Sequence, residues 1–476
     1  MHNRPPIHPT IAALATPAGV GGVAVVRISG PNARLVGANL CPNLQVAMPR
    51  MLVWGQFRDG EDVLDDGLAV WFKGPASFTG EDVVELHCHG GRAVVEAVLQ
   101  AVLAHKGVRL AERGEFTRRA VESGKMDLTA AEGLADLIEA ETEAQRRQAL
   151  RQLGGALGER FESWRSRILG VLAQVEAGLD FPDEELEILS DARLLEGFKQ
   201  LLAEWDNALR EEAGRKVRDG LSLAILGAPN AGKSTLLNAL AGREVAIVSA
   251  IAGTTRDVVR QVLNLGGYAV EVADTAGLRD KTEDTIEREG MKRARKTAEA
   301  ADIVVWVADA QTLKSTGGLF SKKQPPTLAT LPPEGVMRAG AGLVVLSHAD
   351  KVDHDLPKTL EIEGLAYPTL ALNLCDEGAA ARLVAALTPM VSVQAGQAEG
   401  AAYLTRQRHA DALREASQKV GEAVRLCVGA SARGDSAAEL VAQELREAAA
   451  AIGTVTGRTT SEDVLDVVFS TFCIGK

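Results

Sequence analysis

Three kinds of hydrophobic pattern follow one another along the chain. Before residue 120 apolar and polar positions alternate, as in the segment Val84–His89, and this period of two predicts half-buried strands. From Thr129 the apolar positions recur every three or four residues, which is typical of amphipathic helices. Between about residues 220 and 350, short apolar runs alternate with helical segments. That alternation predicts a parallel sheet with helices on both faces.

The helical pattern lies on both sides of the α/β segment. Thr129 and Glu132 have the spacing of a capping box, and Phe181-Pro182 is expected to end the first tract. Its apolar face is formed by Leu150, Leu153, Leu157, Phe161, Trp164, Ile168, Leu172, Val175 and Leu179. More helix is predicted over 191–218, 408–427 and 437–451. We therefore predict one helical domain with the α/β domain inserted into it; separate bundles on either side are the alternative.

A phosphate-binding loop is predicted in the middle of the chain, after the strand Leu221–Leu226. The segment Gly227-Ala-Pro-Asn-Ala-Gly-Lys-Ser234 has the required spacing and leads into a helix. Its backbone N–H groups surround phosphate oxygens, Lys233 neutralises the β- and γ-phosphates, and the Ser234 hydroxyl is a ligand for Mg²⁺. The nucleotide contacts predicted here are Asn230, Ala231, Gly232, Lys233, Ser234 and Thr235.

Two later motifs are typical of GTPases. Thr255 has the position of the threonine that closes over Mg²⁺ and the γ-phosphate, and Asp274 and Gly277 follow the strand Tyr268–Ala273. Asp274 is suited to the Mg²⁺ shell and Gly277 to sensing the γ-phosphate. The predicted nucleotide contacts therefore also include Ser249, Ala250, Ile251, Ala252, Gly253, Thr254, Thr255, Asp274, Thr275, Ala276, Gly277 and Asp350, with Mg²⁺ on Ser234 and Thr255.

The guanine-reading motif departs from the usual Asn-Lys-x-Asp. The apolar run Leu343–Leu346 leads into Ser347-His348-Ala349-Asp350, so only the aspartate matches. Its carboxylate accepts two donors of guanine that adenine lacks, so a buried Asp350 selects GTP over ATP. We expect Ser347 and His348 to weaken nucleotide affinity.

Leu278 stands where Ras-type enzymes carry the glutamine that orients the attacking water. A leucine side chain has no group for this task. Another residue must position the water, and another positive charge must replace the arginine finger, whose contribution is roughly 10³ to 10⁵ in rate. The nearest acidic candidates are Glu283, Asp284, Glu287 and Glu289.

Charge and cysteine content narrow the class. A formal net charge of −12 argues against a broad nucleic-acid-binding surface. The five cysteines include no CxxC pair, which favours a reducing compartment over a disulfide framework or zinc ribbon. In His87-Cys88-His89 the cysteine points away from both histidines, which argues against a metal site. The polar start and the lack of a long apolar run lead us to expect a cytoplasmic protein that does not enter the membrane.

A set of specific segments spans the whole chain and resembles the tRNA modification GTPase MnmE (TrmE) family. They are Ala15-Thr-Pro, Gly21–Gly30, Phe78–Gly91, Gly114–Ala120, Gly124–Thr129 and the terminal Cys473-Ile-Gly-Lys476. The resemblance implies a multidomain α/β plus all-α fold. We assign 1–122 to an N-terminal α+β, tetrahydrofolate-binding-like and dimerisation domain, 123–217 and 398–476 to the two parts of a helical domain, and 218–397 to an inserted Ras-like P-loop GTPase domain.

The resemblance also implies site residues and cofactors. It places 5-formyl- or methylene-tetrahydrofolate on Arg27, Glu85, Lys125 and Lys476, and K⁺, in the role of an arginine finger, on Asn230, Ser249, Ile251 and Thr254. It makes Glu287 the catalytic residue that positions the water, with Glu283 as the alternative because one extra residue precedes the motif. Cys473 remains open between a reactive thiol and a small buried side chain.

The implied reaction is modification of the wobble uridine of certain tRNAs at carbon 5, of the carboxymethylaminomethyl type. It is carried out by a homodimer with the flavoprotein MnmG, which would supply much of the tRNA-binding surface. Two other classes stay open: a ribosome-assembly GTPase of the Era or EngA kind, and a folate-dependent methyltransferase-like enzyme with a vestigial GTPase domain. The first requires a basic appended domain, and none is visible in the sequence.

Overall fold

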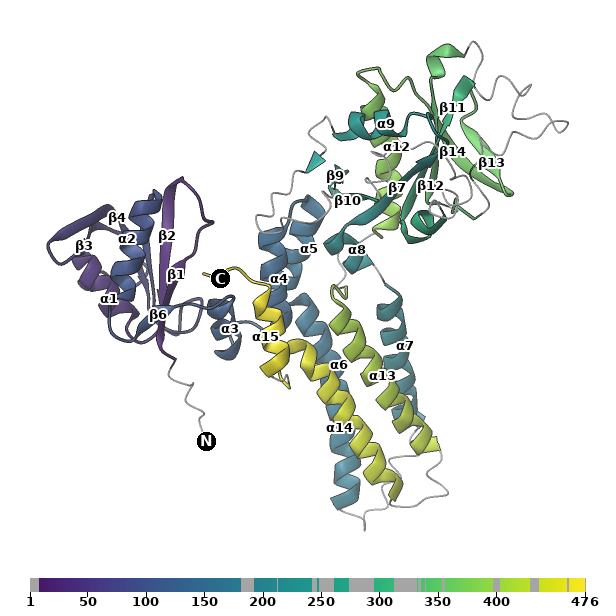
Figure 1. The fold of residues 1–476 in the computed structure, drawn as a ribbon. Helices are drawn as coiled ribbons and strands as arrows, with labels where there is room; N and C mark the ends of the chain where they lie inside the picture. The colour runs from purple at the N-terminus through teal and green to yellow at the C-terminus, as the bar shows by residue number, and fades with distance from the viewer. Residues whose placement is uncertain are drawn as a thin grey trace. The chain divides into compact units, whose positions relative to one another are not determined.

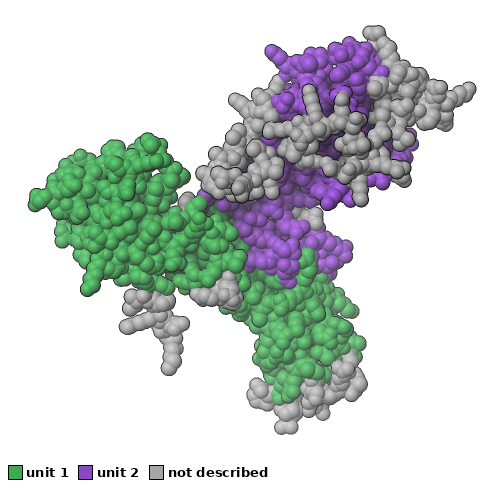
Figure 2. Space-filling view, viewed as in Figure 1, with its two compact units in different colours: residues 1–135, 152–202, 412–476 green, residues 136–151, 203–411 purple. Residues whose placement is uncertain are grey.

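The structure, a computed structural model, describes most of the chain (Figure 1). The described residues are 8–180, 192–211, 213–241, 246–247, 261–273, 295–311, 332, 335–338, 340–352, 356–396, 403–428, 436–459 and 462–475. They form two compact units (Figure 2). The first contains residues 1–135, 152–202 and 412–476, and the second contains 136–151 and 203–411. The four domain boundaries predicted from the sequence divide the chain more finely and remain predictions.

The first unit opens with a six-stranded sheet in the order β3-β4-β5-β2-β1-β6. Its strands are β1 (Thr10–Leu14), β2 (Gly21–Ser29), β3 (Val53–Asp59), β4 (Asp62–Phe72), β5 (Val83–Gly90) and β6 (Val108–Leu110). The helices α1 (Ala33–Leu40) and α2 (Arg92–Leu103) pack against one face (Figure 1). On that face Val26, Ile28, Val84 and Leu86 are fully buried. The predicted alternation is therefore confirmed.

The other face of this sheet carries the polar positions of the same strands. Strands β2 and β5 are antiparallel, and their register puts Arg27 opposite Glu85 and Val25 opposite His87. Because side chains alternate across a strand, Arg27, Glu85 and His87 share one face. The helix α3 (Glu115–Glu122) places the buried ring of Phe116 beside this face, close to Arg27. The fold thus leaves an open polar surface with an aromatic border.

The helical part of the first unit contains α4 (Leu128–Glu139) up to residue 135, α6 (Ala156–Asp180) and α14 (Ser436–Thr456). Helices α6 and α14 pack side by side (Figure 1). Arg446 contacts Glu176, whereas the later Arg458 contacts the earlier Glu162, so the two helices run antiparallel. This pairing joins residues on both sides of the inserted segment, as predicted.

Two details of the helical prediction are wrong. The first helix is capped by Asp127, whose Oδ1 accepts a hydrogen bond from the Ala130 N–H at 2.8 Å, because an aspartate stands two residues before the expected Thr129 box. Leu150, assigned to the apolar face, is also exposed; the face itself is divided between two helices, because Gly155 (φ 91°) separates α5 (Glu143–Leu153) from α6. A glycine in the left-handed conformation ends α5, so the apolar face of α6 begins at a new angle around its own axis.

The C-terminal segment docks on the N-terminal part of the same unit. The helix α15 (Glu462–Ser470) contacts α3, and Phe469 and Phe472 are buried beside Leu128 and Ala131. Ile474 then forms an antiparallel bridge with Arg113. A Cβ added to Gly475 would collide with the carbonyl oxygen of Leu14, at the end of β1. The tail therefore depends on glycine at this position for its close approach to the sheet.

The second unit contains an eight-stranded sheet in the order β13-β14-β12-β11-β7-β10-β9-β8. Its strands are β7 (Leu221–Gly227), β8 (Ala246–Ile247), β9 (Gln261–Leu265), β10 (Tyr268–Ala273), β11 (Ile303–Asp309), β12 (Gly342–Ser347), β13 (Thr359–Ile362) and β14 (Leu365–Ala371). Strands β10, β7, β11, β12 and β14 are parallel, as predicted, whereas the pairings of β8, β9 and β13 are antiparallel. The helices α9 (Lys233–Ala241) and α12 (Ala379–Gln394) pack on this sheet. The fold class predicted from the sequence is confirmed.

One helix of the predicted helical domain belongs to this second unit. Ala144, in α5, packs against the core of the sheet, and its N–H donates to the Gly267 carbonyl at 3.1 Å. The Gln148 amide donates to the Gly214 carbonyl at 2.8 Å, in the short helix α8 (Ala213–Asp219). The remaining helices, α7 (Ala192–Arg210) and α13 (Gln407–Val428), have residues in both units. Among the described helices, none combines the length and the apolar character needed to cross a bilayer.

Candidate functional site

The phosphate loop connects β7 to α9 at the carboxyl end of the central strand. Gly227 (φ 150°) and Gly232 (φ 96°) adopt conformations that favour glycine, and a Cβ on Gly227 would collide with the Val307 carbonyl oxygen. Asn230 is also left-handed (φ 63°), a conformation that asparagine tolerates better than most residues. The loop therefore has the backbone that the sequence motif predicts.

Lys233 lies across the inside of this loop. Its Nζ donates to the carbonyl oxygens of Gly227 at 2.9 Å and Ala228 at 2.7 Å. Burial lowers the pKa of this ammonium. The positive charge is thus held over the amino end of α9, where backbone N–H groups and the helix dipole also favour an anion. This arrangement fits the terminal phosphates of a nucleotide.

The groups that follow Lys233 fit a divalent cation bridged to those phosphates. Ser234 and Thr235 are both exposed on the first turn of α9. A hydroxyl oxygen is a hard ligand of the kind that Mg²⁺ prefers, and Mg²⁺ keeps most of its other positions for water and phosphate. Ser234 therefore remains the predicted Mg²⁺ ligand among the described residues.

The end of β12 lies against the phosphate loop. Ser347 is fully buried, and its Oγ donates to the Ala308 carbonyl at 3.2 Å. A Cβ built on Gly232 would lie 3.6 Å from Ser347 Cβ and 2.8 Å from Leu374 Cδ1. Asp350 is exposed, not buried as the sequence argument assumed, because it lies in a short 3-10 turn beyond the strand. The phosphate-binding and base-reading segments are nevertheless neighbours.

The remaining predicted nucleotide and potassium residues lie outside the described residues. They are Ser249, Ala250, Ile251, Ala252, Gly253, Thr254, Thr255, Asp274, Thr275, Ala276 and Gly277, together with Leu278, Glu283 and Glu287. Lys476 of the predicted folate set lies outside them as well.

The N-terminal sheet brings two of the predicted folate residues together. Arg27 donates from Nε and Nη2 to Glu85 Oε1, both at 2.9 Å. His87 Nε2 lies 3.5 Å from the other carboxylate oxygen. The His87 imidazole and the Arg27 charge hold the pKa of the Glu85 carboxyl below its ordinary value. An ionised carboxylate and a guanidinium therefore stand side by side on the open face.

Aromatic rings border this pair. The Arg27 guanidinium lies 5.6 Å from the ring centroid of Phe78 and 5.8 Å from that of Phe116. Lys125 is exposed, and no hydrogen bond or ion pair of the described residues joins it to Arg27 or Glu85. A polar pair between aromatic rings fits a flat heterocycle with hydrogen-bond donors and acceptors on its edge.

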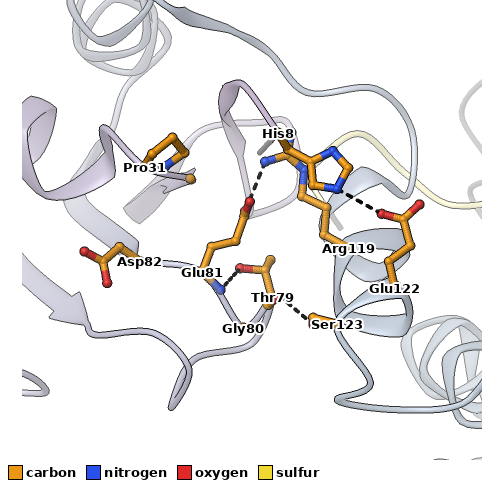
Figure 3. Close-up of a pocket in the computed structure, with 10 residues that line it drawn as sticks. His8, Pro31, Thr79, Gly80, Glu81, Asp82, Arg119, Glu122 and Ser123 are labelled. Carbon is orange, nitrogen blue, oxygen red and sulfur yellow. Dashed lines mark hydrogen bonds and ion pairs between the residues drawn. The ribbon is translucent and has the colours of Figure 1, made fainter. Parts of the chain in front are cut away.

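Sequence reasoning missed a second polar cluster in the same domain, around a cavity of about 320 Å³ (Figure 3). Arg119 is 2% exposed and contacts Glu81 at 3.0 Å and Glu115 at 2.7 Å. Figure 3 shows Glu81 directed at Arg119 and His8 at Glu122. Because these charges satisfy one another, the cluster supports the fold. The cavity is lined by His8, Gly30, Pro31, Thr79, Gly80, Glu81, Asp82, Arg119, Glu122 and Ser123.

The described residues bear on two further interpretations, the role of Cys473 and the presence of a metal site. Cys473 is exposed, so its interpretation as a buried packing residue is wrong. Its carbonyl accepts a hydrogen bond from the Gly114 N–H at 3.4 Å. No group of three or more His, Cys, Asp or Glu side chains suited to a metal ion occurs among the described residues.

Comparison with known proteins covers the whole chain. The family model of the MnmE helical domain matches residues 128–473, and that of the GTP-binding protein TrmE N-terminus matches 10–125. The tRNA modification GTPase MnmE of Caulobacter vibrioides is 48% identical over 98% of this chain and 99% of its own length. The MnmE of Parvibaculum lavamentivorans is 46% identical over 98% of this chain and 100% of its own. Among solved structures, the G domain of the T. maritima FeoB iron transporter matches 36% of this chain and 99% of its own length at 16% identity, with a TM-score of 0.21.

Proposed function

The chain belongs to the tRNA modification GTPase MnmE family, and we propose that its GTP hydrolysis is stimulated by potassium and serves a folate-dependent reaction on tRNA. The chain is a GTPase that acts in tRNA modification. In the proposed reaction, the protein and the flavoprotein MnmG install a carboxymethylaminomethyl-type group on carbon 5 of the wobble uridine of certain tRNAs. The observation that carries the proposal is the Arg27–Glu85 pair on the open face of the N-terminal sheet.

The folate proposal follows from the charges of this pair. When bound, 5-formyl- or methylene-tetrahydrofolate supplies the one-carbon unit. Glu85, ionised beside Arg27, accepts hydrogen bonds from donors of the pterin edge, and Arg27 orients this carboxylate and donates to acceptors of the same heterocycle. Lys125 and Lys476 are cations for the carboxylates of the glutamate tail. The ring of Phe78 lies close to the Arg27 guanidinium and is the aromatic group available to the ligand, whereas Phe116 is fully buried behind the pair. The docked tail supports the proposal, because Gly475 lies beside Leu14 and β1 pairs directly with the strand of Arg27.

The potassium proposal accounts for Leu278. A K⁺ ion, when bound, supplies the positive charge that other GTPases obtain from an arginine finger. We propose Asn230, Ser249, Ile251 and Thr254 as its ligands, Ser234 and Thr255 as those of Mg²⁺, and Glu287 as the residue that positions the attacking water. The exposed, left-handed Asn230 supports this assignment, since its side chain is accessible to an ion at the phosphate loop.

The proposed partners are a second copy of this chain, MnmG and tRNA, in the cytoplasm. Large apolar side chains are exposed on the N-terminal sheet and its loops, including Val20 (85%), Val23 (62%) and Trp54 (64%). Exposed apolar surface of this kind is typical of a protein interface. The net charge of −12 is consistent with a partner that contributes much of the surface for tRNA.

Mass spectrometry of tRNA nucleosides tests the proposal. Cells that lack this protein are expected to lose the modified wobble nucleoside, and a plasmid with the wild-type gene is expected to restore it. The Arg27→Ala variant should not restore it, whereas Arg34→Ala should, because Arg34 lies over Trp71 on the opposite side of the sheet. An unchanged wobble nucleoside together with a defect in ribosome assembly would instead support the Era or EngA class.

A further inference from the structure

His348 has a strained backbone at the rim of the nucleotide site. Its φ of 55° and ψ of 34° lie in the left-handed region, which costs a non-glycine residue about 1 kcal/mol or more. The residue directly follows β12, at the carboxyl end of a parallel strand, where open α/β sheets bind their ligands. Asn230, in the phosphate loop, has the same kind of conformation (φ 63°). Left-handed residues other than glycine cluster at active sites and ligand-binding segments.

One edge of the His348 imidazole is buried. Its Nδ1 is buried, has no hydrogen-bond partner within the described residues, and lies 3.9 Å from Asp309 Oδ2 at the end of β11. The side chain is nevertheless 34% exposed. One edge of the ring is therefore turned toward the sheet, while the rest of the ring remains accessible from solvent.

The residue before His348 in the chain lies against the phosphate loop. Ser347 lies next to Gly232 of the phosphate loop, as its 3.6 Å separation from a Cβ built there shows. A nucleotide with its phosphates in that loop extends its base along the carboxyl ends of the neighbouring strands. The Ser347 hydroxyl is already bonded to the Ala308 carbonyl and is buried. The Ser347 hydroxyl is therefore not available to a base.

We propose that His348 stacks its imidazole on the face of guanine and so compensates for the asparagine and lysine that the usual guanine-reading motif has at positions 347 and 348. A flat aromatic ring offers its π face to any base, so stacking supplies affinity without selectivity. Asp350, two residues further on, accepts the donors on the guanine edge and supplies the selectivity. The proposal deepens the GTPase activity alone and is independent of the potassium, folate and MnmG proposals.

Calorimetric binding of GDP to the full chain tests the stacking. His348→Ala is expected to weaken GDP about five- to a hundredfold, the range for loss of one base–aromatic stack. His348→Phe keeps a flat ring and is expected to stay close to the wild type. Lys351→Ala, an exposed residue of the same turn, is the matched control and should leave binding unchanged.

Two further probes separate stacking from other causes. IDP lacks the exocyclic amine of guanine, so His348→Ala should weaken IDP by the same factor as GDP, whereas Asp350→Ala should reduce the preference for GDP. Inorganic pyrophosphate, measured by competition, should bind wild type and His348→Ala equally if the phosphate loop is intact. Unchanged GDP affinity in His348→Ala would overturn the proposal. So would equal weakening in His348→Ala and His348→Phe, since the imidazole would then act through Asp309.

Discussion

Arg27 shows how a single strand position acquires a chemical role. Cross-strand register places its guanidinium against Glu85, and the two side chains stay partly accessible, 22% and 18% exposed, beside α3. Such a pair on a fully solvated surface contributes little to stability, roughly 0–1 kcal/mol. The Arg27 guanidinium also lies near the rings of Phe78 and Phe116. The pair is therefore better suited to binding a ligand than to stabilising the fold.

Folate affinity is the prediction at this scale. Arg27→Ala is expected to weaken 5-formyltetrahydrofolate by about 1.5–3 kcal/mol, roughly ten- to a hundredfold in Kd, because it removes charge-assisted hydrogen bonds. Arg27→Lys keeps the charge but not the planar fork and should be intermediate. Calorimetry on the full chain measures both, with Arg34→Ala as control. Equal affinity in the wild type and Arg27→Ala would reject this site.

At the scale of the element, helix α3 depends on Glu115, its first residue. Both Nη atoms of Arg109 donate to its carboxylate at 2.7 Å, and Arg119 and the Glu112 N–H donate as well. Burial alone would raise the pKa of Glu115, but these donors outweigh it and lower the pKa to about 2. A carboxylate at a helix amino terminus is also favoured by the helix dipole.

The stability of α3 is therefore expected to depend on pH. Because the folded-state pKa of Glu115 is below its ordinary value of 4.5, its contribution is full above that value and is lost as the pH falls toward about 2. Glu115→Gln should reduce the free energy of local unfolding by about 3 kcal/mol at pH 7, and by much less at pH 3. Hydrogen exchange of peptides covering α3 measures this difference, corrected for intrinsic rates. Glu122→Gln, in a more exposed ion pair of the same helix, is the control; an effect as large as that of Glu115→Gln would refute the assignment.

On the scale of the whole molecule, the two units differ from the domains suggested by the sequence. Helix α5 belongs to the unit of the eight-stranded sheet, with Ala144 bonded to the β9–β10 turn and Gln148 to α8. In the same unit, Asp136 Oδ1 accepts hydrogen bonds from Arg218 Nε at 3.1 Å and from Arg406 Nη2 at 2.7 Å. Asp136 lies in α4, so α4 holds the arginines on both sides of the inserted segment, while α5 contacts the sheet and α8.

Potassium dependence is the prediction for the intact protein. GTP turnover is expected to be much faster in K⁺ than in Na⁺, because the ion substitutes for an arginine finger worth on the order of 10³ or more in rate. Asn230→Ala should remove most of this difference, and Glu287→Ala should abolish turnover in both salts. Asn238→Ala, an exposed asparagine on α9, is the control for Asn230. Equal turnover of the wild type in K⁺ and Na⁺ would contradict the mechanism.

Sequence alone determined what depends on local spacing. The phosphate loop requires glycine at positions 227 and 232, so the motif can be recognised from one short run of consecutive residues. The strand alternation of Val84–His89 likewise predicted which side chains share a face, because the side-chain period of a strand is fixed. Asp127 and Thr129 are both suitable cap residues by spacing, and the prediction of Thr129 was wrong, because Asp127 accepts the hydrogen bond from the Ala130 N–H.

Tertiary structure decided what depends on segments far apart in the chain. The burial of Arg119 between Glu81 and Glu115, the docking of α5 on the sheet unit, and the approach of Gly475 to Leu14 each join residues whose separation carries no periodic signal. The same holds for His348, whose deviation from the guanine motif was visible in the sequence but indicated only weaker binding. Its left-handed backbone and its position beside Asp309 depend on packing at the ends of β11 and β12. These two features are the basis for the proposed stacking of His348 on guanine.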